Sequence, residues 1–290
     1  MTGRRTSRAR GAAREHAALR YAAIYAGLAP FILIALFPVA WMTITAFKHE
    51  RDLYSMQFPL WFNLPPTLKH FDLLFTQTWF GIWVLNTALV SIGAVGITLL
   101  VTIPAAYALA RLNLPGAESA GIAMFMTYLV PPIVLFLPLA PVVAKLGLSD
   151  SWWALVVLYP TFTIPFCTWF LTGFLRALPG ELEEAAWRDG CGRVGGIARI
   201  VLPASLPGIA TTAAFAFSLS MQEYLYAVIF ASPVDQKVIS VGLPTMLIRG
   251  DVFFWGALMA AALLVAIPTA VAFHLVLDRL VLGLTGAVAR

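Results

Sequence analysis

Long apolar runs separated by short polar segments dominate the pattern of this chain. A bilayer core about 30 Å thick is crossed by roughly 20 helical residues, and six apolar segments reach that length. Their approximate bounds are 21–47, 82–110, 119–144, 152–177, 203–231 and 254–280. The pattern therefore predicts an all-α polytopic membrane protein with six transmembrane helices.

Prolines interrupt the third and fourth of these segments. They are Pro131, Pro132, Pro138, Pro141, Pro160 and Pro165. A proline inside a helix removes one backbone hydrogen bond and bends the helix, and neighbouring helices can satisfy the carbonyls that it frees. We expect kinks in both spans. Broken helices of this kind can line a path or simply pack, and packing is the default interpretation.

Composition supports a membrane protein and excludes several other classes. The chain is 60% hydrophobic and 11% charged, whereas soluble domains carry about 25% charged residues. Its net charge of +5 comes mostly from arginines beside the spans, where they set orientation, so it requires no nucleic acid. The two cysteines, Cys167 in a span and Cys191 in a loop, indicate neither a disulfide framework nor a metal site.

The distribution of Lys and Arg predicts the orientation of the spans. With both termini in the cytoplasm, thirteen of the 19 basic residues fall on the cytoplasmic side, as the positive-inside rule requires. They are Arg4, Arg5, Arg8, Arg10, Arg14, Arg20, Arg111, Arg176, Arg188, Arg193, Arg199, Arg279 and Arg290. The sequence therefore predicts an N-in, C-in protein.

This orientation divides the chain into consecutive regions. Residues 1–20 form a basic cytoplasmic tail, and the apolar run 21–47 is too long for the core of a cleaved signal peptide, so it is read as a retained first helix. Residues 48–81 form an extracytoplasmic loop rich in Trp, Phe and Pro. Residues 82–285 form the transmembrane core, and 286–290 form a C-terminal tail.

The cytoplasmic loop at 178–202, between the fourth and fifth spans, concentrates charge in an otherwise apolar chain. Residues 181–188 are strong helix formers, and the acids at their start suit the positive end of a helix dipole. Gly190 permits a left-handed residue after this helix, and Pro203 suits the start of the next one. The segment is interpreted either as a docking surface for a soluble partner or as a solvated connector.

The same residues carry a family resemblance. Glu184-Ala185-Ala186, Asp189-Gly190, Ile200 and Leu202-Pro203 resemble the EAA loop of binding-protein-dependent ABC importer permeases. Similarity to the carbohydrate-uptake branch, of the maltose-type second permease subunit, extends over roughly residues 70–285. The further motifs are Leu85-Asn86-Thr87, Ala105-Ala106-Tyr107-Ala108-Leu109-Ala110-Arg111, Pro131-Pro132, Leu146-Gly147-Leu148-Ser149-Asp150 and Phe174-Leu175-Arg176-Ala177-Leu178-Pro179.

The resemblance implies a role for the loop and a set of partners. In that family the loop is a coupling helix that docks on an ATPase subunit, and Glu184 would pair with a basic group there while Gly190 makes the turn. The residues implied in docking are Glu184, Ala185, Ala186, Arg188, Asp189 and Gly190. The implied partners are a second permease, an ABC ATPase dimer and an extracytoplasmic substrate-binding protein, in the bacterial inner membrane.

No catalytic residue and no cofactor are expected on this chain. It lacks the Gly-x-x-x-x-Gly-Lys-Ser/Thr phosphate loop, so ATP and Mg²⁺ are expected on the partner ATPase. No histidine has the spacing of a metal ligand, and no metal site is predicted. The chain would be a permease that transports a sugar or related polar solute.

Polar residues late in the fifth span are candidates for the translocation path. Glu223 lies about eight residues before the end of the predicted span, roughly 12 Å below that interface at 1.5 Å per residue. Intramembrane acids are costly and usually face a cavity or a partner, so Gln222, Glu223 and Tyr224 either line the path or make structural hydrogen bonds. The family often has an aromatic residue where this chain has Met221, which leaves the solute unassigned.

Two other function classes compete with the importer. An ion-gradient-driven secondary transporter would need several ionisable residues within its spans, whereas Glu223 is the one acid placed clearly inside a predicted span. An intramembrane protease would need a nucleophile with a base, and Ser218 and Ser220 have no histidine near them in sequence. The secondary transporter is the main alternative.

Overall fold

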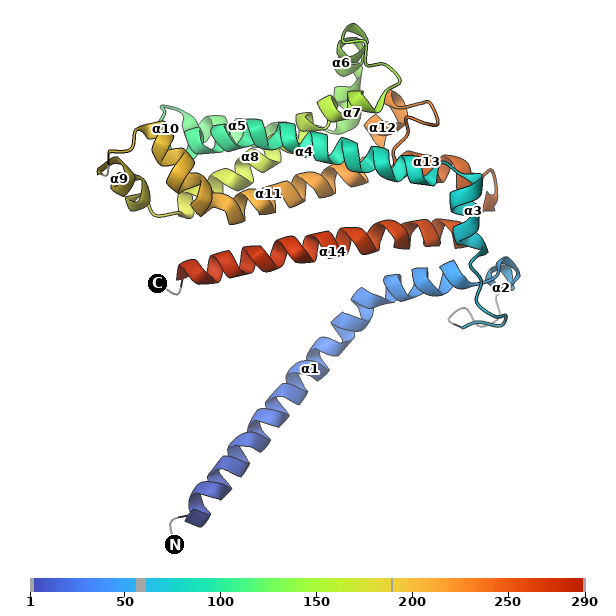
Figure 1. Cartoon of the computed structure of the whole chain (residues 1–290), viewed down its shortest axis with the longest axis horizontal. Coiled ribbons are helices and arrows are strands. Elements are labelled where there is room, and N and C mark those ends of the chain that lie inside the picture. The colour runs from blue at the N-terminus through green and yellow to red at the C-terminus, as the bar shows by residue number, and fades with distance from the viewer. Residues whose placement is uncertain (1–2, 56–60, 189, 289–290) are drawn as a thin grey trace. The chain divides into compact units, whose positions relative to one another are not determined.

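The computed structural model describes residues 3–55, 61–188 and 190–288. These residues are helical, apart from loops and one antiparallel hairpin of β1 (Ile248–Arg249) and β2 (Val252–Phe253) (Figure 1). They fall into two compact units. The first runs to Phe71 and includes Phe254–Leu263, and the second contains Asp72–Phe253 and the chain from Leu264 onwards.

The first unit contains α1 (Gly3–Phe47), α2 (Glu50–Tyr54) and the beginnings of α3 (Lys69–Gln77) and α14 (Trp255–Val288). Its loop is organised by buried polar groups, because the His70 Nε2 lies 2.7 Å from the Lys48 carbonyl oxygen. The Asp52 carboxylate accepts the backbone N–H of Asn63 at 2.9 Å. The predicted extracytoplasmic loop is therefore an ordered structure where the chain is described.

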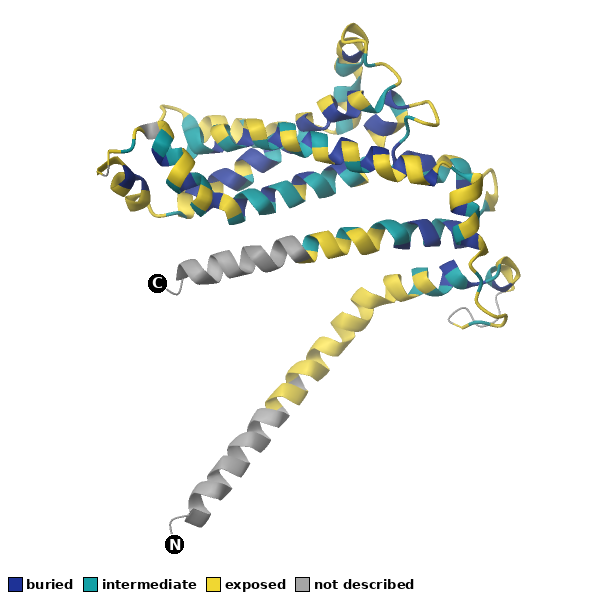
Figure 2. Cartoon of the chain, viewed as in Figure 1, coloured by how far each residue is buried: buried dark blue, intermediate teal, exposed yellow. Residues whose placement is uncertain are grey.

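Three long helices form the centre of the second unit. They are α4 (Phe80–Arg111), α8 (Pro160–Ala177) and α11 (Leu202–Gln222), and each packs on the other two. Figure 2 shows buried residues on α4 and α8, and small side chains such as Ala94 and Ala106 are fully buried there. Small residues let helices approach closely where lipid supplies no hydrophobic drive for their association.

Threonine hydroxyls cross the contact between α4 and α8. Thr98 and Thr163 have their Oγ1 atoms 2.6 Å apart, and Thr168 donates to Thr102 at 3.4 Å. All four side chains are fully buried. We call these two pairs the threonine seam. The apolar periodicity of the sequence gives no indication of it.

The third predicted span, 119–144, is two helices rather than one kinked helix. α5 (Ala117–Tyr128) and α6 (Pro132–Lys145) meet at an angle of 92°. Pro131 lies in the break and Pro132 begins α6. The residue before a proline is disfavoured in the helical conformation, so the backbone turns sharply there. The fourth span consists of α7 (Trp152–Leu158) and α8, which meet at Tyr159–Pro160.

The fifth predicted span, 203–231, is wrong in its length. α11 ends at Gln222, and a separate short helix, α12 (Leu225–Phe230), follows it. The chain turns because Glu223 is extended, with ψ at 131°, and its carbonyl oxygen accepts the Ser240 hydroxyl at 2.7 Å. The next helix, α13 (Ile239–Leu247), packs on α4.

The predicted cytoplasmic loop contains α9 (Glu181–Arg188), α10 (Arg193–Gly196) and the π-helical turn η1 (Ile197–Val201), which runs directly into α11. These short helices lie at one end of the second unit (Figure 1). The loop is therefore helical over much of its described length.

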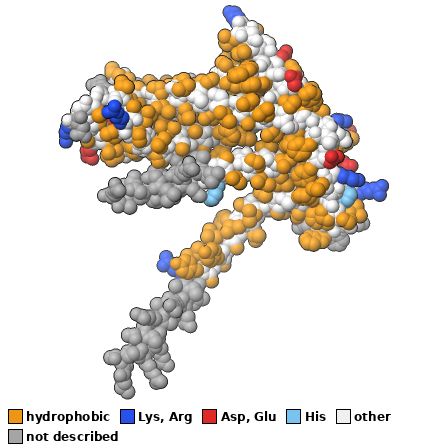
Figure 3. Space-filling view, viewed as in Figure 1, with side chains coloured by type: hydrophobic (Ala, Val, Ile, Leu, Met, Phe, Trp, Pro, Cys, Tyr) orange, Lys and Arg blue, Asp and Glu red, His pale blue; other side chains and the backbone are white. Residues whose placement is uncertain are grey.

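Five helical segments of the described chain are long and apolar enough to cross a membrane, and the bent pair α5 and α6 makes a sixth candidate. Hydrophobic side chains cover much of the visible surface (Figure 3). Phe31 on α1 and Leu100 on α4 are each more than two-thirds exposed. Exposed apolar side chains in such number on each unit indicate contact with lipid or with other subunits. The N-in, C-in orientation stays a prediction.

Candidate functional site

Helix α9 begins where the sequence places strong start signals. The preceding helix ends at Ala177, its C-cap Leu178 has an extended backbone, and Pro179 then prevents continuation of the helix. The Gly180 carbonyl oxygen accepts the N–H groups of Glu183 and Glu184 at 3.0 and 3.3 Å. The acids of this first turn lie at the positive end of the helix dipole, where negative charge is stabilising.

The end of α9 is fixed by Gly190. Its φ is +82°, its N–H donates to the Trp187 carbonyl oxygen at 3.1 Å, and the Cys191 N–H donates to the Ala186 carbonyl oxygen at 3.0 Å. These are the two hydrogen bonds of a Schellman motif, in which the left-handed residue is usually glycine. Gly190 therefore stops the helix and reverses the chain. Asp189 lies outside the described residues.

The two faces of α9 have different roles. Glu183 and Ala186, three residues apart, are buried, while Glu184, Ala185 and Arg188 are exposed. The resemblance implies docking by both Ala185 and Ala186, whereas the structure places them on different faces of α9, with Ala185 exposed and Ala186 buried. Ala186 lies against Gly196, so it supports the loop from within. We call Glu184, Ala185 and Arg188 the outer face of α9.

An exposed ion pair lies on the outer face. The Arg188 Nη2 donates to the Glu184 Oε2 at 3.1 Å, with the two side chains 79% and 57% exposed. An exposed pair with i,i+4 spacing is worth only about 0.3–0.5 kcal/mol. A cationic group on another molecule can therefore replace Arg188 at little cost, and Glu184 remains available for an external contact.

Sequence reasoning missed the role of Glu183. Its Oε1 lies 3.0 Å from the Arg111 Nε, with side-chain exposures of 8% and 16%, and its Oε2 accepts the Tyr107 hydroxyl at 3.0 Å. The Arg111 Nη2 also donates to the Leu178 carbonyl oxygen at 2.7 Å. We call Tyr107, Arg111 and Glu183 the Arg111 cluster. The sequence did contain one signal for this role. Glu183 lies three residues before Ala186, and this spacing puts the two side chains on the same face of a helix, which here is the buried one.

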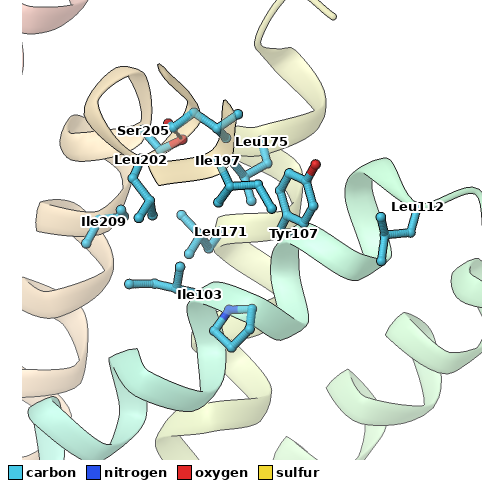
Figure 4. Close-up of a pocket in the computed structure, with 11 residues that line it drawn as sticks. Ile103, Tyr107, Leu112, Leu171, Leu175, Ile197, Leu202, Ser205 and Ile209 are labelled. Atoms are coloured by element: carbon cyan, nitrogen blue, oxygen red, sulfur yellow. Dashed lines mark hydrogen bonds between the residues drawn. The ribbon is translucent and has the colours of Figure 1, made fainter. Parts of the chain in front are cut away.

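An apolar cavity of about 460 Å³ adjoins the Arg111 cluster. Figure 4 shows its lining side chains converging from α4, α8 and the η1–α11 segment, with Tyr107 among them. The lining residues are Ile103, Pro104, Tyr107, Leu112, Leu171, Leu175, Ile197, Val201, Leu202, Ser205 and Ile209. The loop therefore lies over incompletely filled space on this side.

The candidate path residues do not converge in the structure. Gln222 and Tyr224 are exposed, and the Glu223 carboxylate accepts the N–H groups of Tyr226 and Ala227 at 3.0 and 3.2 Å. These bonds satisfy N–H groups in the first turn of α12 that have no partner within the helix, so Glu223 has a structural role. Asn86 also has one, because its Nδ2 donates to the carbonyl oxygens of Asp235 and Lys237. A role in the path stays a prediction.

No group of three or more His, Cys, Asp or Glu side chains that could hold a metal ion occurs in the described part of the chain. The exposed charged side chains of the outer face suit contact with another protein.

Comparisons with known proteins agree with the sequence motifs. A family model described as "Binding-protein-dependent transport system inner membrane component" matches residues 99–285. The chain is 32% identical over 251 residues to the sulfoquinovosyl glycerol transport system permease protein SmoH of Agrobacterium fabrum, covering 86% of this chain and 87% of the relative. It is 33% identical over 256 residues to the diacetylchitobiose uptake system permease protein DasC of Streptomyces coelicolor, covering 87% and 91%.

A solved structure confirms the fold. A chain of a bacterial ABC transporter involved in the import of the acidic polysaccharide alginate superimposes with a TM-score of 0.62, at 18% identity, covering 90% of this chain and 96% of that one. The all-α polytopic prediction is thereby confirmed. The chain belongs to the family of binding-protein-dependent transport system inner membrane components, and is therefore a multi-pass permease subunit of an ABC importer rather than an enzyme.

Proposed function

We propose that this permease forms, with a second permease subunit, the path for a sugar or related polar solute. An extracytoplasmic binding protein delivers the solute, and two ATPase subunits, which bind ATP and Mg²⁺, supply the energy. The proposed contact with the ATPase is the outer face of α9. Closure of the ATPase pair then moves α9 and changes which side of the membrane the path opens to, as in other rigid-body switches.

The observation that carries this proposal is the exposure of the outer face. Glu184 and Arg188 extend from a short helix that is closed at its end by Gly190 and held from within by Glu183. A surface that is charged outside and anchored inside can transmit force without deforming. A solvated connector would need neither the buried ion pair nor the Schellman ending.

The solute class is supported by the relatives. Two of them are named for transport or uptake of sulfoquinovosyl glycerol and diacetylchitobiose, and a third for maltodextrin. These compounds are all carbohydrates or carbohydrate derivatives. We therefore propose a carbohydrate, with diacetylchitobiose and sulfoquinovosyl glycerol as first probes.

Reconstitution tests the energy source. The chain is co-purified with the permease, ATPase and binding protein encoded beside it and placed in vesicles, and uptake of the two labelled probes is measured with and without ATP. We expect uptake to require ATP hydrolysis. Uptake by this chain alone, driven by a proton or sodium gradient, would establish the secondary transporter instead.

A charge reversal tests the contact itself. We expect Glu184→Lys to insert normally but to lower recovery of the ATPase in pull-down by at least about tenfold, because a loss of 1.4 kcal/mol already corresponds to that factor. Glu118→Lys is the matched control, since Glu118 is exposed near the start of α5. Equal ATPase recovery with the two variants would contradict docking through the outer face.

A further inference from the structure

The Arg111 cluster joins two elements that are 70 residues apart in the chain. Arg111 is the last residue of α4, and Glu183 lies in the first turn of α9. One guanidinium reaches both the Glu183 carboxylate and the Leu178 carbonyl oxygen just before α9. Tyr107, one turn earlier on α4, holds the second carboxylate oxygen. Oε2 thus accepts a hydrogen bond from α4, and Oε1 is held there by the charge of Arg111 without an aligned hydrogen bond.

Burial makes this connection stiff. The Glu183 and Arg111 side chains are 8% and 16% exposed, in contrast with the Glu184–Arg188 pair on the opposite face. Removing one partner of a buried pair leaves a charge that lacks both water and a counter-charge, which is strongly unfavourable. The carboxylate therefore cannot leave α4 while α9 moves, unless a comparable partner replaces Arg111.

Packing offers a weaker connection between the same two elements. The backbone of α9 lies close to α10 and η1, which belong to the same loop. The cavity of about 460 Å³ lies between α4, α8 and the η1–α11 segment, and beside it Val201 of η1 packs in a buried cluster with Ala106 of α4. Apolar contact between the loop and α4 therefore runs through η1, whereas the polar side chains of the Arg111 cluster connect α9 to α4 directly.

We propose that Glu183 is a positioning residue that makes α4 move with α9, so that the Arg111 cluster transmits the ATPase movement to the second span. This inference rests on the proposed function, because it requires α9 to be the contact with the ATPase. Two neighbouring acids then have different roles. Glu184 faces the partner, and Glu183 carries the resulting movement into the membrane part of the chain.

The test measures how α4 responds when the ATPase closes. A fluorophore is attached at Leu100→Cys, an exposed position on α4, in a Cys191→Ser background; the remaining Cys167 is fully buried. The signal change on adding ATP, Mg²⁺ and vanadate is recorded in the reconstituted complex. Glu181→Gln is the matched control, because Glu181 is an exposed acid on the same helix.

We expect Glu183→Gln to keep the ATPase bound and hydrolysing but to lose most of the α4 signal, because the connection from α9 to α4 is then broken. Glu181→Gln should respond as the parent does. Equal signals from the two variants would overturn the inference. If the parent chain itself fails to bind ATPase or to respond to ATP, the proposed function fails first.

Two further variants separate transmission from a simple charge imbalance. Arg111→Gln combined with Glu183→Gln leaves no unpaired charge, and we expect the α4 signal to stay low because the connection is still absent. Recovery of the signal in that double variant would overturn the inference. Should Glu183→Gln yield no complex, Tyr107→Phe removes one hydroxyl and keeps the ion pair. A partial loss of signal supports transmission, and a full signal refutes it.

Discussion

Gly242 on α13 allows the close contact between that helix and α4. A Cβ added at Gly242 would overlap the indole ring of Trp83. The ring has no room to withdraw, because Trp83 is fully buried and its Nε1 donates to the Val234 carbonyl oxygen at 2.7 Å. The backbone of α13 is also held, since the Ile239 N–H donates to the Thr87 hydroxyl at 2.8 Å. We therefore expect Gly242→Ala to destabilise the protein.

The size of the effect follows from two opposing contributions. Overpacking a filled core costs about 1–3 kcal/mol, while replacing a helical glycine by alanine gains about 0.5–1 kcal/mol. Because Trp83 and α13 are both fixed, we expect the upper part of that difference, about 1.5–2.5 kcal/mol of lost stability. At about 2–4 °C per kcal/mol for a chain of this size, Tm should fall by about 3–10 °C.

The assay is thermal unfolding of the purified protein in detergent, with Gly96→Ala as the control. Gly96 lies in α4, and a Cβ there would meet nothing within 4 Å. The same chemical change should therefore leave Tm unchanged or raise it slightly. A Tm for Gly242→Ala equal to or above that of Gly96→Ala would refute the argument that Trp83 is immovable.

Two further predictions concern the hydrogen bond between two neutral threonine hydroxyls and the hydrogen bonds to the Asp52 carboxylate. Thr98→Val and Thr163→Val should each lower the free energy of unfolding by about 0.6 kcal/mol, the mean measured for such bonds between membrane helices. The double variant should lose less stability than the sum of the two single losses. If unfolding measurements show that the two losses add in full, the hydroxyls do not interact. Burial raises the pKa of the Asp52 carboxyl, but hydrogen bonds from Asn63 and the charge of Lys48 outweigh it and hold that pKa below its ordinary value. Stability from Asp52 should thus be complete above about pH 3.9 and be lost as pH falls through the lower folded pKa; a difference in Tm between the parent and Asp52→Asn that does not shrink on acidification below pH 3.9 would contradict this.

The long apolar runs were sufficient to predict the spans, because lipid imposes one length and one composition on all of them. They could not predict where helices stop within a run. Glu223 ends α11 through its carboxylate contacts with α12 and its carbonyl contact with Ser240. Those partners follow Glu223 by three and seventeen residues, and hydropathy carries no information about them.

The candidate site was predictable as a segment but only partly by residue. Gly190 could be assigned to the turn because a left-handed conformation favours glycine. Glu183 and Glu184 are chemically identical neighbours, and their opposite surroundings depend on Arg111, about 70 residues earlier. Spacing along the helix puts Glu183, but not Glu184, on the same face as the buried Ala186. That Ala186 is the buried residue, however, becomes known only once α9 has folded against the rest of the loop.

The threonine seam fixes the rotational phase of α4 relative to α8. Thr98 and Thr102 lie one helical turn apart and meet Thr163 and Thr168. Turning either helix by one residue, about 100° at 3.6 residues per turn, would carry both hydroxyl pairs out of reach and leave four polar groups facing apolar surroundings. We therefore expect this pair of helices to pass through the transport cycle without rolling over each other, so that the sliding surfaces lie elsewhere in the assembly.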